Sequence, residues 1–179
     1  MFIIPGYLIS LLTFPGVIIH EWSHKKFCEW TRVRVEKVVY YRFSFSGKPA
    51  GYVIHEEPKK YTQTFWISVG PLVINSLASI VLTIFASFFS SESIIWIFLM
   101  WVGVSAGVNA FPSNHDMKNI WETSKKEIKT SGNILHYLAF IFVAVMWIAN
   151  ALRFFWFDFL YAFLLVGVGS SIASYLFGL

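Results

Sequence analysis

Two histidines and a glutamate near the N-terminus have the types and spacing of a metal-dependent hydrolytic site. His20, Glu21 and His24 form an H-E-x-x-H motif at the end of a long apolar run. Residues four apart share one face of a helix, so His20 and His24 can present two imidazoles to one metal ion. Glu21 lies beside the first ligand, where a carboxylate can take a proton from water. The motif predicts a Zn²⁺ site, and the alternative is a pair of histidines capping a membrane helix.

A catalytic zinc needs a third protein ligand and an open position for water. His115 and Asp116 follow the third long apolar run, so they would lie at the same membrane face as the motif. Asp116 would supply an oxygen ligand, whereas His115 would give a site of three histidines. Spacing alone does not separate these two neighbours.

The composition predicts a membrane protein. Of 179 residues, 56% are hydrophobic and only 13% are charged, whereas a soluble domain carries about a quarter charged residues. Apolar runs near bilayer-crossing length repeat along the chain. We therefore expect one α-helical, polytopic membrane domain over residues 1–179. The formal net charge of +4 does not indicate nucleic acid, because the basic residues concentrate in two loops between apolar runs.

About five apolar runs are predicted to be transmembrane helices. They are Phe2–His24, Tyr61–Phe89, Ile94–Phe111, Ile134–Trp156 and Phe157–Leu179. In the first run, Pro15-Gly16 is expected to bend or loosen the helix, as is Pro5-Gly6. A tight turn flanked by Arg153 and Asp158 would join the last two runs.

Two glycines in the third run have the G-x-x-x-G spacing that lets helices approach closely. Gly103 and Gly107 could pack against a helix of the same chain or of a second copy. A homo-oligomer is therefore one of two alternatives.

The segment 25–60 differs in kind from the apolar runs, because it holds nine of the fourteen Lys and Arg residues. From Val33 to Phe45 apolar and polar side chains alternate, which favours a strand. Residues 46–49 have the composition of a turn, and 50–54 have that of a second strand. We expect a small β-hairpin at the membrane surface. It is either a β-rich linker or an edge strand whose Gly51, Tyr52 and Val53 pair with an extended substrate.

Five spans would place both basic regions, residues 25–60 and 112–133, on one side of the membrane together with the motif. The opposite turns hold only Arg153 among basic residues. The positive-inside rule then predicts an external N-terminus and an active site near the cytoplasmic face of the cell membrane.

The order of these pieces resembles the site-2 protease family of intramembrane zinc metalloproteases. The resemblance covers about residues 10 to 118 and rests on His20-Glu21-x-x-His24, Gly70-Pro71-x-x-x-Asn75 and an Asn109-x-x-Pro112 stretch leading to Asp116. It implies that Asp116 is the third zinc ligand, within a loop 112–133. It also implies that Glu21 is the general base and that the hairpin engages substrate.

The sequence thus predicts a zinc-dependent endopeptidase that cuts membrane proteins in or near their transmembrane segments. Asn75 and Asn109 would steady the oxyanion or the unwound substrate, or else bond neighbouring helices. One alternative is a non-proteolytic membrane protein whose structural or vestigial zinc site binds a partner. Another is a zinc peptidase acting on lipidated peptides. The intact Glu21 argues against a structural zinc site, because such a site needs no base.

Overall fold

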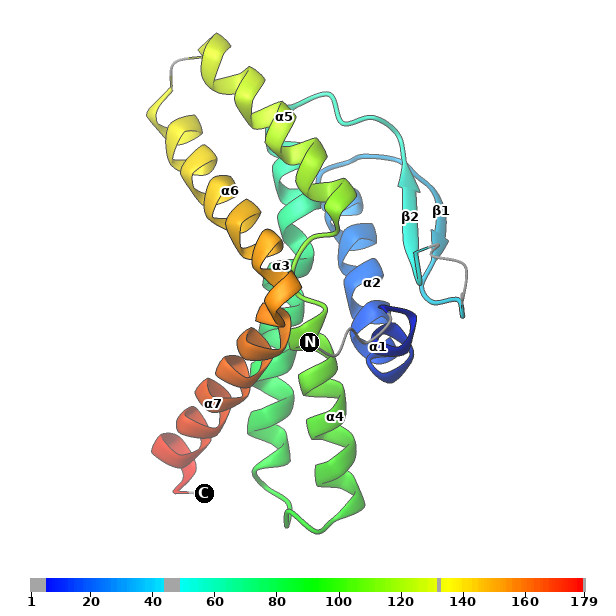
Figure 1. The fold of residues 1–179 in the computed structure, drawn as a ribbon, viewed down its shortest axis with the longest axis vertical. Coiled ribbons are helices and arrows are strands. Elements are labelled where there is room, and N and C mark those ends of the chain that lie inside the picture. The colour runs from blue at the N-terminus through cyan, green and yellow to red at the C-terminus, as the bar shows by residue number, and fades with distance from the viewer. Residues whose placement is uncertain (1–5, 44–48, 132, 179) are drawn as a thin grey trace.

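The computed structural model describes residues 6–43, 49–131 and 133–178, and most of them are helical (Figure 1). The elements in chain order are α1 (Gly6–Leu12), α2 (Phe14–Trp30), β1 (Val35–Val39), β2 (Tyr52–His55), α3 (Tyr61–Ala86), α4 (Ile94–Val108), α5 (Asn114–Ser131), α6 (Ile134–Leu152), the short 3₁₀ helix η1 (Arg153–Phe155) and α7 (Phe157–Phe177).

The central element is α3, whose 26 residues extend for about 39 Å at 1.5 Å per residue. One half of its length packs against α2 and α5, and the other half packs against α4 and α7 (Figure 1). Almost every other helix is therefore placed relative to α3.

Small residues set the distances between the packed helices. A Cβ atom on Gly16 of α2 would overlap the carbonyl of Ser105 in α4, and one on Gly70 of α3 would overlap the ring of Phe27. On Gly107 it would lie 2.8 Å from Cα of Ala162 in α7. The G-x-x-x-G segment in α4 therefore packs inside the chain.

The first predicted span is interrupted, as its Pro-Gly pairs suggested. Helix α1 ends at Leu12, and α2 begins at Phe14 with Pro15 in its first turn. Proline is tolerated there because the first N–H groups of a helix have no partner within it. Pro5 and the start of this span lie outside the described residues.

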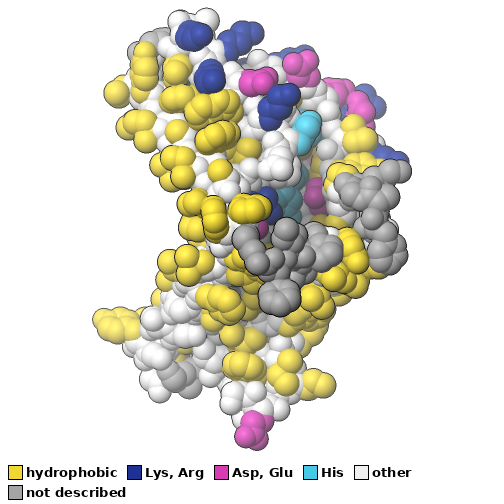
Figure 2. All heavy atoms as spheres, viewed as in Figure 1, with side chains coloured by type: hydrophobic (Ala, Val, Ile, Leu, Met, Phe, Trp, Pro, Cys, Tyr) yellow, Lys and Arg dark blue, Asp and Glu magenta, His cyan; other side chains and the backbone are white. Residues whose placement is uncertain are grey.

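Among the residues that the structure describes, three helical segments are long and apolar enough to cross a membrane: Tyr61–Ala86, Ile134–Phe155 and Phe157–Phe177. Helix α4 is apolar but only 15 residues long. Three of the five predicted spans thus have the length and apolar composition of a membrane-crossing helix, and the number five stays a prediction. Hydrophobic side chains cover the lower part of the molecule and its α6 side, whereas charged and histidine side chains gather near α5 and the strands (Figure 2).

Helices α6 and α7 do not form the predicted pair of adjacent helices joined by a tight turn. Helix α6 packs on α5, and α7 packs on α3 and α4. The two helices follow one another along the long axis, with η1 and the left-handed Trp156 (φ 65°) between them (Figure 1). Helix α5 likewise follows α4 along the long axis (Figure 1). The α4–α5 segment and the α6–α7 segment therefore lie beside α3 and run in opposite directions.

The predicted hairpin is present as an antiparallel pair of strands. Val38 pairs with Val53 and Val39 with Tyr52, and a bulge interrupts the ladder between Val35 and Lys37. Both strands are shorter than the sequence pattern suggested, and most of the predicted turn lies outside the described residues. In Figure 1, β2 lies between β1 and the helices.

The glycine contact between α2 and α4 can be tested by substitution. Gly16→Ala should lower the free energy of unfolding by about 1–3 kcal/mol, because the added methyl group forces the two backbones apart. Gly167→Ala is the matched control, since a Cβ at that helical position meets nothing within 4 Å. Thermal unfolding in detergent measures both variants, and equal stability of the two would contradict this packing.

Candidate metal centre

The two motif histidines lie one helical turn apart on the buried face of α2. His20 is 8% exposed and His24 is 6% exposed. Their Nε2 atoms lie 3.1 Å apart. The helix therefore directs both imidazoles to the same point, as the i, i+4 spacing predicts.

Backbone carbonyls fix the orientation and the tautomer of both rings. Nδ1 of His20 lies 2.7 Å from the carbonyl oxygen of Asn109, and Nδ1 of His24 lies 2.9 Å from that of Ile67. A carbonyl only accepts, so each Nδ1 must carry the proton and donate it. Each neutral ring then has a lone pair on Nε2, which is the arrangement of a metal-binding histidine.

Both carbonyls are free because a helix is interrupted beside them. Pro71 lies inside α3 and has no N–H, so the carbonyl four residues earlier, that of Ile67, lacks its helical donor. Asn109 is the C-cap of α4, where the last carbonyls of the helix have no partner within it. His24 and His20 supply the missing donors.

Asp116 comes to the two imidazoles from α5. Its Oδ2 lies 3.4 Å from Nε2 of His24, and it accepts hydrogen bonds from the N–H and Oγ of Ser113 at 3.1 and 2.6 Å. Burial disfavours its charge, but the positive charge that His24 carries when Nε2 is also protonated, together with the hydrogen bonds from Ser113, holds the pKa of the carboxyl below its usual range. The residue is a carboxylate at neutral pH.

The donor set fits a divalent cation. One ligand atom from each of His20, His24 and Asp116 lies within 4.8 Å of the others. Each Nδ1–H donates to a carbonyl, so the two Nε2 atoms and the carboxylate oxygen that converge here all carry lone pairs. Such atoms repel one another unless a cation or an extra proton lies between them. Two imidazoles and a carboxylate, with space left for water, are ligands typical of catalytic zinc.

Both candidates for the third ligand line the cavity, and the geometry of the cluster favours Asp116 over His115. His115 is exposed, and its Nδ1 lies 3.3 Å from the side-chain nitrogen of Asn119. It lies outside the group formed by the two motif histidines and Asp116. Both residues are in the first turn of α5 and not in a loop, so neighbouring side chains point about 100° apart.

Glu21 lies beneath the start of β2. It is 8% exposed, and a Cβ on Gly51 would come within 2.6 Å of its Cγ and 3.0 Å of its Oε1. A glycine at position 51 therefore lets the hairpin close over this carboxylate. Gly51, predicted as a substrate contact, thereby also helps to place Glu21.

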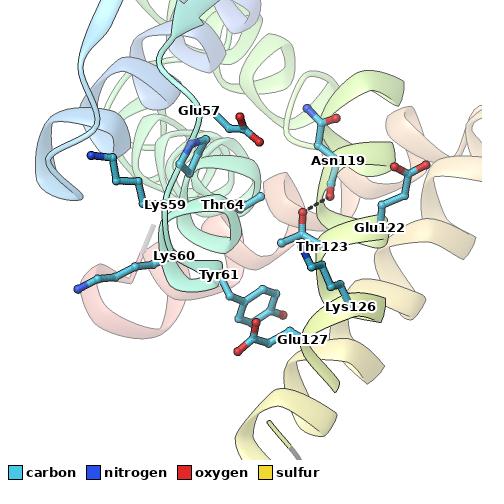
Figure 3. A pocket seen from close by; sticks show the side chains of 11 residues that line it. Glu57, Lys59, Lys60, Tyr61, Thr64, Asn119, Glu122, Thr123, Lys126 and Glu127 are labelled. Atoms are coloured by element: carbon cyan, nitrogen blue, oxygen red, sulfur yellow. Dashed lines mark hydrogen bonds between the residues drawn. The ribbon is translucent and has the colours of Figure 1, made fainter. Parts of the chain in front are cut away.

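A cavity of about 810 Å³ opens onto these groups. Its walls are the motif residues, residues 51–55 of the hairpin and the start of α5, including Asp116. Tyr52 and Val53 thus line the cavity together with Gly51, and their pairing with a substrate stays a prediction. A polar pocket of about 580 Å³ adjoins the cavity, because Glu57 and Asn119 line both. Figure 3 shows this pocket between α5 and the start of α3.

The two asparagines support the histidines and do not line the cavity. Nδ2 of Asn75 donates to the carbonyls of Gly16, Ala106 and Asn109, and the side chain is completely buried. Nδ2 of Asn109 donates to Thr13 and Ser105. Since these amide donors are already used inside the protein, the geometry favours the helix-bonding alternative over oxyanion contact.

Two groups that hold the ligands in place could not be found from the sequence. The carbonyl of Ile67 and the hydroxyl of Ser113 have no sequence signature of their own. Pro71 did carry a signal, because a proline inside an apolar helix predicts a free carbonyl four residues earlier. The group that donates a hydrogen bond to that carbonyl could not be predicted from the sequence.

Comparison of the chain with protein-family models, curated proteins and solved structures found no match. The resemblance to site-2 proteases therefore stays a prediction from the sequence motifs.

Metal analysis of detergent-purified protein tests the ligand set. The unaltered chain should hold about one Zn²⁺, and His20→Ala, His24→Ala and Asp116→Ala should each lose it, because three protein ligands are the usual minimum for a catalytic zinc. His115→Ala is the adjacent control and should retain the metal. Retention by Asp116→Ala together with loss by His115→Ala would reverse the assignment.

The role of Pro71 gives a second test. Pro71→Ala restores an N–H that competes with His24 for the carbonyl of Ile67, so the dissociation constant for Zn²⁺ should rise about 10-fold. The helix itself should not be weakened, because alanine is the better helix former. Pro15→Ala, in the first turn of α2, is the control. A chelator titration that gives the same Zn²⁺ affinity for all three proteins would refute this role.

Proposed function

We propose that the protein is a zinc-dependent endopeptidase that hydrolyses peptide bonds in or near transmembrane segments. The observation that carries this proposal is the convergence of His20, His24 and Asp116 beside Glu21 in one cavity. The site-2 protease resemblance assigns the same roles to the same residues.

The residues divide the chemistry between them. Zn²⁺ held by the two histidines and Asp116 would polarise the substrate carbonyl and lower the pKa of a water to about 7. Glu21 accepts a proton from the water as its oxygen attacks the carbonyl carbon. When the C–N bond breaks, Glu21 returns that proton to the leaving nitrogen, so the carboxylate is regenerated with one water consumed.

The free edge of β2 offers a way to hold an extended substrate. Ala50 O and the N–H of Glu56 bond to the β1 side of the hairpin. Backbone groups of alternate residues point to opposite edges of a strand, so those of Val53 and His55 point to the other edge. Among the described residues no strand pairs with that edge, and the cavity lies along it. A peptide added there would pass the metal ligands as an extended chain.

A membrane setting agrees with the surface of the molecule. Each of the three span-length helical segments exposes apolar side chains, such as Leu77, Leu138 and Leu164, and Ile134–Phe155 exposes most of its own. The turn between α3 and α4 carries Glu92 and no basic residue, whereas the opposite end carries the lysines of α5. We therefore propose a multi-pass protein of the cell membrane whose site lies toward the cytoplasmic face. The substrate would be a membrane protein or membrane peptide.

A structural zinc site that binds a partner is the main alternative from another class. A structural site does not explain why Glu21 lies in the cavity beside the ligands. The space for this carboxylate exists because residue 51 is a glycine without a Cβ atom. A peptidase for lipidated peptides would use the same chemistry and differ only in substrate.

Glu21→Gln tests the proposal directly. The amide cannot accept the proton of water, so cleavage should fall by at least about 100-fold, while Zn²⁺ content and thermal stability stay unchanged. The assay is hydrolysis of a panel of fluorescently labelled single-span membrane peptides in detergent. Glu57→Gln is the matched control, since Glu57 lines the same cavity. Cleavage by the Glu21→Gln protein at the unaltered rate would eliminate the proposed mechanism.

A further inference from the structure

An arginine and an aspartate lie at the junction of two apolar helices. Nε of Arg153 donates to Oδ2 of Asp158 at 2.8 Å, and the side chains are 34% and 14% exposed. Both residues belong to span-length helical segments. Ionisable side chains in such segments are costly and usually serve a site. This pair therefore calls for a role beyond joining α6 to α7.

The arginine reaches the chain segment that carries the third metal ligand. Its NH1 group donates to the side-chain oxygen of Asn150 at 3.2 Å and to the carbonyl of Pro112 at 3.5 Å. The side-chain nitrogen of Asn150 in turn donates to Oδ1 of Asn114 at 2.8 Å. Asn150 in the last turn of α6 and Arg153 at the start of η1 thus contact the residues on both sides of Ser113.

Ser113 is the residue that holds the Asp116 carboxylate. Its backbone N–H and its hydroxyl both donate to Oδ2, the oxygen that faces His24. A displacement of the Pro112–Asn114 segment would therefore move the carboxylate relative to the two imidazoles. Asp116 needs such support more than the histidines do, because it is the one ligand that is not on α2.

We propose that Arg153 and Asn150 are positioning residues of the metal centre. They hold the Pro112–Asn114 segment against the α6–α7 junction, and Asp158 fixes the guanidinium in turn. A metal ligand has to be held within about 0.5 Å of its productive position, and this network connects α6 to the start of α5 for that purpose. The inference rests on the metal centre of the proposed function but not on peptide hydrolysis.

The experiment measures Zn²⁺ affinity of the whole chain in detergent by competition with a chromophoric chelator. Arg153→Gln and Asn150→Ala should each raise the dissociation constant about 10-fold or more, the usual effect of losing outer-shell support. Asn133→Ala is the control, because this asparagine caps the other end of α6 through the N–H of Leu135. Its Zn²⁺ affinity should match that of the unaltered chain.

A conservative variant separates positioning from general stability. Arg153→Lys keeps the charge beside Asp158, but an ammonium does not reproduce the planar fork that contacts Asp158, Asn150 and Pro112 together. The metal-free variant should unfold near the temperature of the unaltered chain, yet its Zn²⁺ affinity should remain weakened. Bound Co²⁺, whose visible absorption reports coordination geometry, should give an altered spectrum.

Three results would overturn the inference. The first is unchanged Zn²⁺ affinity in folded Arg153→Gln and Asn150→Ala proteins. The second is an equal loss of affinity in the Asn133→Ala control. The third is no Zn²⁺ binding by the unaltered chain, which would remove the metal centre as well. Zn²⁺ binding that depends on Arg153, in a protein that cleaves no peptide, would uphold the inference and reject the peptidase.

Discussion

The structure depends on two buried imidazoles whose Nδ1 protons are bound by backbone carbonyls of other segments. His24 donates to the carbonyl of Ile67 in α3, and His20 donates to that of Asn109 at the end of α4. Buried polar groups need partners, so these two bonds require α2, α3 and α4 to meet at one level. The close contact of Gly16 with Ser105 makes that meeting possible, and Asn75 reinforces it by bonding carbonyls of α2 and of the α4 end.

The same two hydrogen bonds use backbone carbonyls that lack a donor within their own helix. A proline in α3 and the end of α4 each leave a carbonyl without a helical donor, which is unfavourable in an apolar environment. Histidine satisfies each carbonyl with one nitrogen and keeps the other nitrogen free for a metal. The interruptions of the helices thus become part of the support of the site, and the cavity above it remains lined by ligands, Glu21 and the hairpin.

Much of this site was readable from the sequence because its parts are local. The H-E-x-x-H spacing predicts two ligands and a carboxylate on one helix, and alternation predicts the hairpin. Asp116 and His115 could not be separated, because the choice depends on where α5 begins and on the 100° turn between neighbouring helical residues. The end-to-end order of α6 and α7 was also missed. Two apolar runs joined by a short polar turn have the same pattern whether they reverse direction or continue. The packing of α6 on α5 and of α7 on α3 and α4 shows which arrangement occurs.

This order of helices also places an apolar surface and a polar cavity at the same level of the molecule. Helix α5 is polar on one side and packs its apolar side on α3 and α6, while α6 exposes apolar side chains along most of its length. The cavity opens between α5 and β2, on the side where charged groups gather (Figure 2). The proposed hydrolysis would consume water, so a site among apolar helices would need a polar approach of this kind. Under the proposed function, α6 would face the bilayer while α5 and the hairpin admit water and an extended chain to the same metal ion.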